Sequence, residues 1–364
     1  MPTMPASARG EDSATPVAAV SSTMRLLLAA ALLPRDQAAE AWRSWLAAVD
    51  FEDLEDGATA LLGLVARNLP ELHAGDAIDG RVRGVQRQTW AGNQVLWSAV
   101  RPLVDRLGTV AGPPLLLPPT ALVPAFDGAW GARPWHRIEL ALHAEAVAGV
   151  RSALASTGWP VDHLTPRLLA WTRAGLVGRW QATDAAGNWV SIRWQLLRGI
   201  GSQVADEQLR GAALSTTVGS ARVHLLHPAD ALVERLWNAP DDLGPGWIVE
   251  VVALARRLEV AQPELGVDPN AGPARFASRA RSLGLSGVLR ERLDVVADVL
   301  DDPAVSSARA ALDRTRRGAV EALWSLPGPV AGVGRTWAGH AAGQGLVGGA
   351  RSVLRVRRAV AQVR

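Results

Sequence analysis

The stretch from Pro113 to Leu142 constrains the fold most, because the chain changes there from helical periodicity to short strands and turns. One apolar run, Leu115–Leu117, ends at a Pro-Pro pair, and a second run covers Ile138–Leu142. Gly128 and Gly131 indicate a turn between them. Because long regions on both sides have helical periodicity, this stretch predicts a small β-sheet set between two helical regions.

Later segments extend the predicted sheet. Three short runs separated by turn signals are expected to be strands: Arg167–Arg173, Leu176–Thr183 and Trp189–Leu196. In the last run, polar residues such as Ser191 and Arg193 alternate with apolar ones, which predicts a strand with two unlike faces. A helix is expected over Ala144–Thr157. The resulting order of strands, helices and a final hairpin predicts a mixed sheet with helices packed on it.

The flanking regions show helical signals. We expect Asp36 and Asp50 to cap two helices, and a long third helix to run from about Gly80 to Leu107. Gly108, with Gly112 and Pro113 just after it, is its stop signal. Trp42, Trp45, Trp90 and Trp194 are expected to pack in the core. Four more helical segments are expected later, at Pro228–Asn238, Trp247–Leu258, Gly272–Leu300 and Ala304–Leu326.

These signals predict an α+β protein in which a small mixed sheet is flanked by N- and C-terminal helical regions. Five parts are expected: a disordered N-terminus (1–21), a helical region (22–110), an α/β domain (111–202), a C-terminal helical domain (203–326) and a Gly/Arg-rich basic tail (327–364). The hydrophobic fraction of 48% is enough for a sizeable core.

Charge and residue usage bear on compartment and partners. The chain has no cysteine, which excludes disulfides and thiolate metal sites, and every basic side chain except histidine is arginine, as in GC-rich bacterial genes. Net charge is +3, yet no acidic residue follows Glu321. The segment 350–364 is therefore a candidate for weak contact with an anionic membrane surface. No run reaches the roughly 18–20 apolar residues that span a bilayer, so we expect a cytoplasmic protein.

Three segments of the chain carry a resemblance to the nucleotidyltransferase superfamily, and to one bacterial branch of it. In that branch a first strand reads L-L-K-G-x-A-L, a second segment R-P-x-G-D-L-D-L-L-V, and a third strand carries D-x-H-W. The matching segments here are Leu116–Leu122, Arg133–Leu142 and Ser191–Trp194. Asp50–Leu54 and Trp247–Val251 fit as flanking pieces. The resemblance extends over residues 24–310 and implies a polymerase-beta-like fold for the central domain.

The resemblance also implies where two metal ions would bind. Nucleotidyl transfer uses two divalent cations about 3.5–4 Å apart, which need hard oxygen ligands. The three carboxylate positions of the family correspond here to Arg137, Glu139 and Ser191. A permanent cation and a neutral hydroxyl replace two of the three carboxylates, so Glu139 is the remnant of the catalytic set and no metal site is expected. With a shifted alignment, Asp127 or Glu145 would be substitutes, but neither belongs to an i, i+2 carboxylate pair.

The expected phosphate-binding turn is altered as well. Where the family has a Lys-Gly pair, this chain has Pro118 and Pro119. Proline has no N–H to donate to a triphosphate and fixes φ near −65°. Both the metal clamp and the phosphate turn therefore depart from the family pattern.

Four basic side chains are the candidate ligand site. Arg133, His136, Arg137 and Arg193 are candidates for a pocket that binds a nucleotide or another anionic small molecule without metal. In the alternative interpretation these arginines pair with Glu139 or face solvent.

The sequence favours a nucleotidyltransferase-like pseudoenzyme that binds or scaffolds an unidentified protein partner and has no cofactor. Two alternatives stay open. One is an active, Mg²⁺-dependent nucleotidyltransferase with a divergent or relocated site, and the other is a helical protein–protein interaction module.

Overall fold

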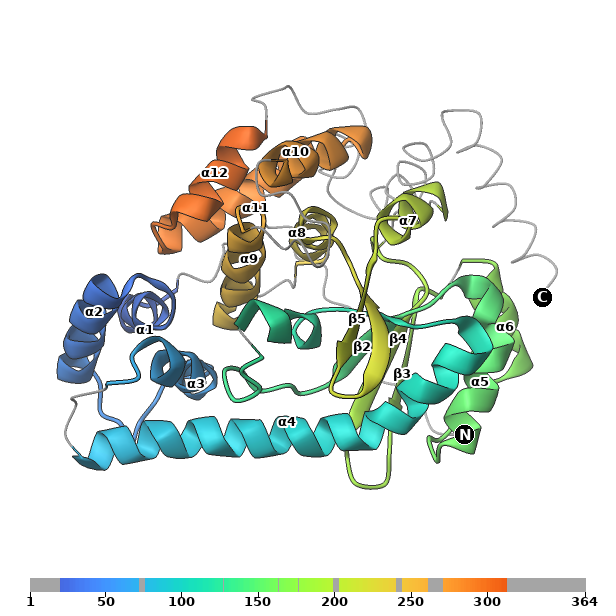
Figure 1. Cartoon of the computed structure of the whole chain (residues 1–364), viewed down its shortest axis with the longest axis horizontal. Helices are drawn as coiled ribbons and strands as arrows, with labels where there is room; N and C mark the ends of the chain where they lie inside the picture. Colours follow the sequence, from blue (N-terminus) through green and yellow to red (C-terminus); the bar gives the residue numbers. More distant parts are fainter. Residues whose placement is uncertain are drawn as a thin grey trace, which may run out of the picture.

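The computed structural model describes residues 20–71, 76–126, 128–162, 164–175, 177–198, 203–239, 244–260 and 271–312. Helices surround a six-stranded mixed sheet in this part of the chain (Figure 1). The predicted mixture of a mixed sheet with N- and C-terminal helices is confirmed. The basic tail and nearly all of the expected disordered N-terminus lie outside the described residues.

Four helices precede the sheet, and their starting points correct the predicted caps. They are α1 (Ser22–Leu32), α2 (Arg35–Ala48), α3 (Ala58–Asn68) and α4 (Asp76–Ala111). Asp36 lies in the first turn of α2, whose N-cap is Pro34. The Asp50 carboxylate accepts a hydrogen bond from Glu52 N, whereas α3 begins after Gly57, whose φ of 85° suits glycine. Ser21 caps α1 by accepting a hydrogen bond from Met24 N.

Helix α4 is 36 residues long and joins the N-terminal helices to the sheet. In Figure 1 it runs along the lower side, from α1–α3 to the sheet and α5 (Val147–Ser156). The helix continues past the expected end at Leu107 to Ala111, and it stops where Gly112, the second glycine of the predicted stop signal, adopts a φ of 78°. Trp90, which was expected in the core, is 53% exposed on this helix. By contrast, Trp42 and Trp45 are buried and stack on each other.

The six strands form one sheet in the order β3-β4-β2-β1-β6-β5. They are β1 (Leu115–Leu116), β2 (Ile138–Ala141), β3 (Arg179–Thr183), β4 (Trp189–Arg193), β5 (Leu214–Val218) and β6 (Ala221–Leu225). Strand β1 pairs antiparallel with β2 and parallel with β6, and β2 pairs parallel with β4. The hairpins β3–β4 and β5–β6 complete the two sides.

Two predicted segments differ in type. The expected strand at Arg167–Arg173 is helix α6 (Pro166–Arg173), which Thr165 caps by accepting a hydrogen bond from Leu168 N. The region expected to be helical from residue 203 begins with α7 (Gln203–Arg210) and then supplies β5 and β6. The shorter elements are η1 (Thr120–Phe126) and η2 (Ala144–Ala146). The later helices are α8 (Pro228–Trp237), α9 (Pro245–Arg257), α10 (Gly272–Ser282), α11 (Ser286–Val299) and α12 (Pro303–Ala311).

The two faces of the sheet are buried in different ways. Ile138, Leu140 and Ile192 pack in one hydrophobic cluster together with residues of α4 and α5. Their neighbours along the strands, Glu139 and Arg193, point to the opposite face because side chains alternate along a strand. On that face Arg193 reaches α8, whose apolar residues belong to the second cluster, formed with the N- and C-terminal helices. None of the described helices has both the length and the apolar character needed to cross a membrane.

Asp206 anchors α7 to the segment that follows β4, and its burial predicts a pH dependence of stability. Its carboxylate is 8% exposed and accepts a hydrogen bond from Leu196 N at 3.1 Å. Burial raises the pKa of Asp206 to about 6, whereas an unfolded aspartate titrates near 3.9. The stabilisation from the bound proton is therefore complete below about pH 4 and is lost as the pH rises through about 6.

We expect Asp206→Asn to remove this contribution. The difference in unfolding free energy between the wild type and Asp206→Asn should change by about 2–3 kcal/mol between pH 4 and pH 7, measured by urea unfolding. The exposed pair of Arg101 and Asp105 offers a control, because Asp105→Asn should change stability by less than about 1 kcal/mol. Parallel profiles for Asp206→Asn would show that Asp206 titrates normally.

Candidate functional site

Glu139 lies at the centre of the candidate site and is held by two arginines. Its side chain is 2% exposed in the middle of β2. Arg137, two residues earlier on the same face of the strand, donates through Nε to Glu139 Oε1 at 2.6 Å and stacks over the Trp189 ring at 5.2 Å. Arg193, on the neighbouring strand β4, forms an ion pair with Glu139 Oε2. Two guanidinium groups therefore occupy both oxygens of this carboxylate.

The ion pairs continue from the sheet into helix α8. Arg193 Nη1 donates to Glu234 Oε1 at 2.6 Å, and Asn238 Nδ2 donates to the same oxygen at 2.8 Å. Burial alone would raise the pKa of Glu139, but Arg193 and Arg137 together hold it below its ordinary value. Burial raises the pKa of Glu234 despite the opposing effect of Arg193. Glu139 thus remains an anion whose charge is already balanced by the protein.

Ser191 is adjacent to Glu139, as the resemblance implies. The two residues are register partners in the parallel pair of β2 and β4, so Arg137, Glu139 and Ser191 share one face of the sheet. The Ser191 hydroxyl is buried and finds no hydrogen-bond partner among the described residues. The Thr120 hydroxyl, at the start of η1, is also buried and has no hydrogen-bond partner among the described residues. The sheet therefore brings the three positions together, with one carboxylate, one cation and one neutral hydroxyl.

The other two candidate residues behave differently. Arg133 forms an ion pair with Glu250 of α9, which also pairs with Arg235 of α8. This second network is adjacent to the first, since Arg235 also lowers the pKa of Glu139. His136 is exposed two residues before β2 begins, and no hydrogen bond or ion pair joins it to the described part of the chain. Three of the four predicted basic residues are thus paired with carboxylates.

The turn after β1 uses its own N–H groups internally. Pro118 and Pro119, joined by a cis peptide bond, have no N–H to donate. Of the first three N–H groups that follow, those of Ala121 and Leu122 donate to the carbonyls of Leu117 and Pro119 at 3.2 and 3.0 Å, and that of Thr120 alone makes no such bond in the described chain. This turn therefore has no free row of N–H groups for a phosphate.

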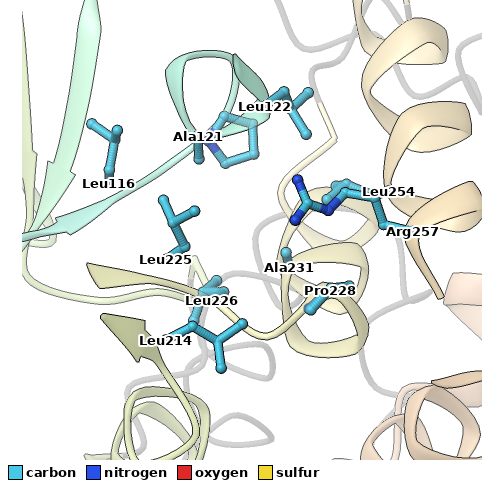
Figure 2. Close-up of a pocket in the computed structure, with 11 residues that line it drawn as sticks. Leu116, Ala121, Leu122, Leu214, Leu225, Leu226, Pro228, Ala231, Leu254 and Arg257 are labelled. Atoms are coloured by element: carbon cyan, nitrogen blue, oxygen red, sulfur yellow. The ribbon is translucent and has the colours of Figure 1, made fainter. Parts of the chain in front are cut away.

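Apolar side chains surround the small pocket beside this turn (Figure 2). Leu116 lines it from β1, Leu122 from η1, and Leu225 and Leu226 from the end of β6. Arg257 is the one charged residue of its lining. Its volume is about 20 Å³, room for about one water molecule, whereas ligand pockets usually measure about 300–1,000 Å³. A nucleoside triphosphate does not fit in this pocket.

Arg179 is a cation of the site that the sequence analysis missed. It begins β3, directly opposite Arg193 in the hairpin, and its side chain is exposed. Within the described ranges no carboxylate forms an ion pair with it. Partial loss of hydration beside the sheet, followed by repulsion from Arg193, Arg137 and Arg198, lowers the pKa of its guanidinium, although Glu139 raises it. Arg137, Arg179, Arg193 and Arg198 form what we call the arginine cluster. Within the described residues its ion pairs are with two carboxylates, Glu139 and Glu234, so the cluster has an excess of positive charge.

The donor set does not fit a two-metal site. Mg²⁺ needs several oxygen ligands, preferably carboxylates, and a fixed guanidinium repels it. Here the one carboxylate is occupied by Arg137 and Arg193. Asp127, a substitute considered from the sequence, lies outside the described residues, and Glu145 is in η2, beyond the end of β2. Among the residues described, no three His, Asp or Glu side chains form a group that could hold a metal ion.

Comparisons of the chain with protein-family models, with curated proteins and with solved structures found no match.

Proposed function

We propose that this chain is a nucleotidyltransferase-like protein that has lost metal-dependent nucleotidyl transfer and serves as a binding or scaffolding protein in the cytoplasm. The observation that carries the proposal is the position of Arg137 and Arg193 on the two oxygens of Glu139. In an enzyme of this class that carboxylate would bind metal. Here two protein cations take the place that the metal would occupy.

We also propose that the arginine cluster binds a nucleotide or another anionic small molecule without metal. The excess of positive charge around Arg137, Arg179 and Arg193 supports it, because an oxyanion can accept hydrogen bonds from the exposed guanidinium groups. Arg137 is 35% exposed and Arg179 is exposed, so both can reach a ligand from solvent. The polar residue Gln181 lies next to them on the same face of β3.

Titration with ATP tests both parts. We expect the same affinity in EDTA and in Mg²⁺, and we expect Arg179→Ala to weaken binding by about tenfold because it removes charge-assisted hydrogen bonds. Thermal shift and calorimetry provide the measurements. Arg43→Ala removes an arginine whose side chain is 70% exposed on α2 and should leave binding unchanged.

Two results would contradict the proposal in different ways. Binding that requires Mg²⁺ and disappears in Glu139→Gln would show that Glu139 still holds a metal, and would favour the active enzyme. If ATP binds neither in EDTA nor in Mg²⁺, the proposal that the arginine cluster binds a nucleotide is wrong, and only the scaffolding role remains.

A further inference from the structure

A separate groove lies at the opposite end of strand β1 from the Pro118-Pro119 turn. It has a volume of about 300 Å³, at the lower end of the usual range for ligand pockets. The segment after α4, the start of β1, the end of β2, the end of α7 and strand β6 form its walls. The groove is therefore built by five segments that the sheet holds together, and it contains none of the arginines discussed above.

Arg210 is the cation of this groove, and within the described residues it has no ion-pair partner. Its Nη2 donates to the Leu142 carbonyl at 3.0 Å, and no carboxylate of the described chain lies within ion-pair distance. Burial lowers the pKa of its guanidinium, while Asp206 and Glu145 raise it from farther away. Buried Arg133 and Arg193 each have a carboxylate in contact. A desolvated guanidinium without such a partner favours an anionic ligand in the adjoining groove.

Three more titratable side chains determine which anion fits. His143 and His224 line the groove on either side of Leu115, and Glu207 lies one turn before Arg210 on α7. Burial and then Arg210 lower the pKa of His143, so at neutral pH its imidazole is uncharged and donates a hydrogen bond without adding charge. Arg210 is therefore the permanent cation that lines the groove, Glu207 is the lining carboxylate, and Asp206 and Glu145 lie farther from the guanidinium. One guanidinium can pair with one carboxylate of a ligand, whereas the neighbouring carboxylates disfavour the double charge of a phosphate monoester.

Apolar groups form the rest of the wall. Leu115, Leu142 and Pro113 face the groove together with the small side chains of Ala111 and Ala213. A ligand with a short hydrocarbon part would bury that part against these residues and gain about 25 cal/mol per Å² of apolar surface.

We propose that this groove is a binding site for a small carboxylic acid with a short apolar body, whose carboxylate pairs with Arg210 and accepts a hydrogen bond from His143 or His224. Glu207 at the rim leaves room for a ligand that also has an amino group, because its carboxylate would accept from that group. The proposal does not depend on the function proposed for the Glu139 site.

Isovalerate, leucine and inorganic phosphate are the probes. We expect isovalerate or leucine to raise the melting temperature of the full chain in a saturable manner, and phosphate at equal concentration to have a smaller effect. Arg210→Gln should weaken carboxylate binding at least about tenfold, since it removes a charge-assisted pair. Glu207→Gln should retain isovalerate binding and weaken leucine binding, because the Glu207 carboxylate accepts a hydrogen bond from the amino group.

Two further variants keep the test decisive. Ala213→Phe fills the groove while Arg210 stays in place, so it should abolish binding even if Arg210→Gln fails to fold. Arg198→Gln changes an arginine of the other cluster and should leave isovalerate binding unchanged. The proposal is wrong if neither carboxylate binds, if phosphate binds more tightly than both, or if binding survives both Arg210→Gln and Ala213→Phe.

Discussion

Glu139→Gln should lower the free energy of unfolding by about 3–5 kcal/mol. The substitution keeps the size of the side chain but removes the one negative charge shared by Arg137 and Arg193. Arg193 is 14% exposed, so its guanidinium would lose a charged partner in a site largely screened from water. Urea unfolding at pH 7 measures the change.

The pair of Glu40 and Arg43 provides the matched control. Both side chains are more than 60% exposed, and Glu40→Gln should change stability by less than about 1 kcal/mol. The sign of the Glu139 result carries functional meaning, because residues retained for catalysis often destabilise the fold and their replacement often stabilises it. A more stable Glu139→Gln variant would therefore contradict our interpretation of Glu139 as a structural ion-pair partner.

The second large effect is expected at Glu250. This residue is almost fully buried in α9 and pairs with both Arg133 and Arg235, so one substitution leaves two guanidinium groups without a charge partner. Glu250→Gln should destabilise the protein by about 3–5 kcal/mol. Arg133 precedes β2 and Arg235 is in α8, so the loss should loosen the contact between the sheet and the C-terminal helices. Hydrogen exchange of α8 and α9 would report this loosening.

An exposed ion pair provides the control that distinguishes the effect of burial from the effect of losing a charge. Asp294 and Arg309 form a pair between α11 and α12 with side chains 38% and 45% exposed. Asp294→Asn should cost less than about 1 kcal/mol. Equal effects for Asp294→Asn and Glu250→Gln would mean that burial of Glu250 adds nothing to the strength of its pairs.

Local sequence signals explain which elements could be predicted. The alternation around Ser191 and the apolar run of β2 predicted two strands that the structure contains. The short apolar run at Arg167–Arg173 was wrongly predicted to be a strand, although Thr165 followed by Pro166 is a helix-start signal. The hairpin of β5 and β6 also had a signal, the Gly219-Ser220 pair between two five-residue runs. Its place beside β1 had no local signal, because pairing between distant strands depends on the whole fold.

In the candidate site, too, some contacts could be predicted from local spacing and others could not. The spacing of Arg137 and Glu139 on one strand implied that they share a face, and the structure shows them paired. The partners Glu234 and Glu250 could not be identified from spacing, since they come from helices 41 positions from Arg193 and 117 positions from Arg133. Arg179 was missed because its role depends on lying opposite Arg193 in a hairpin whose register the sequence did not define.

The parallel pairing of β1 with β6 has a consequence for synthesis of the chain. Leu115 pairs with His224, more than one hundred positions later, so one edge of β1 stays open until the ribosome has produced β6. At about 5–20 residues per second this interval lasts roughly 5–20 s. During that time an apolar strand with unpaired backbone groups is exposed to other nascent chains. The newly synthesised chain should therefore depend on chaperones more than its folded structure would suggest.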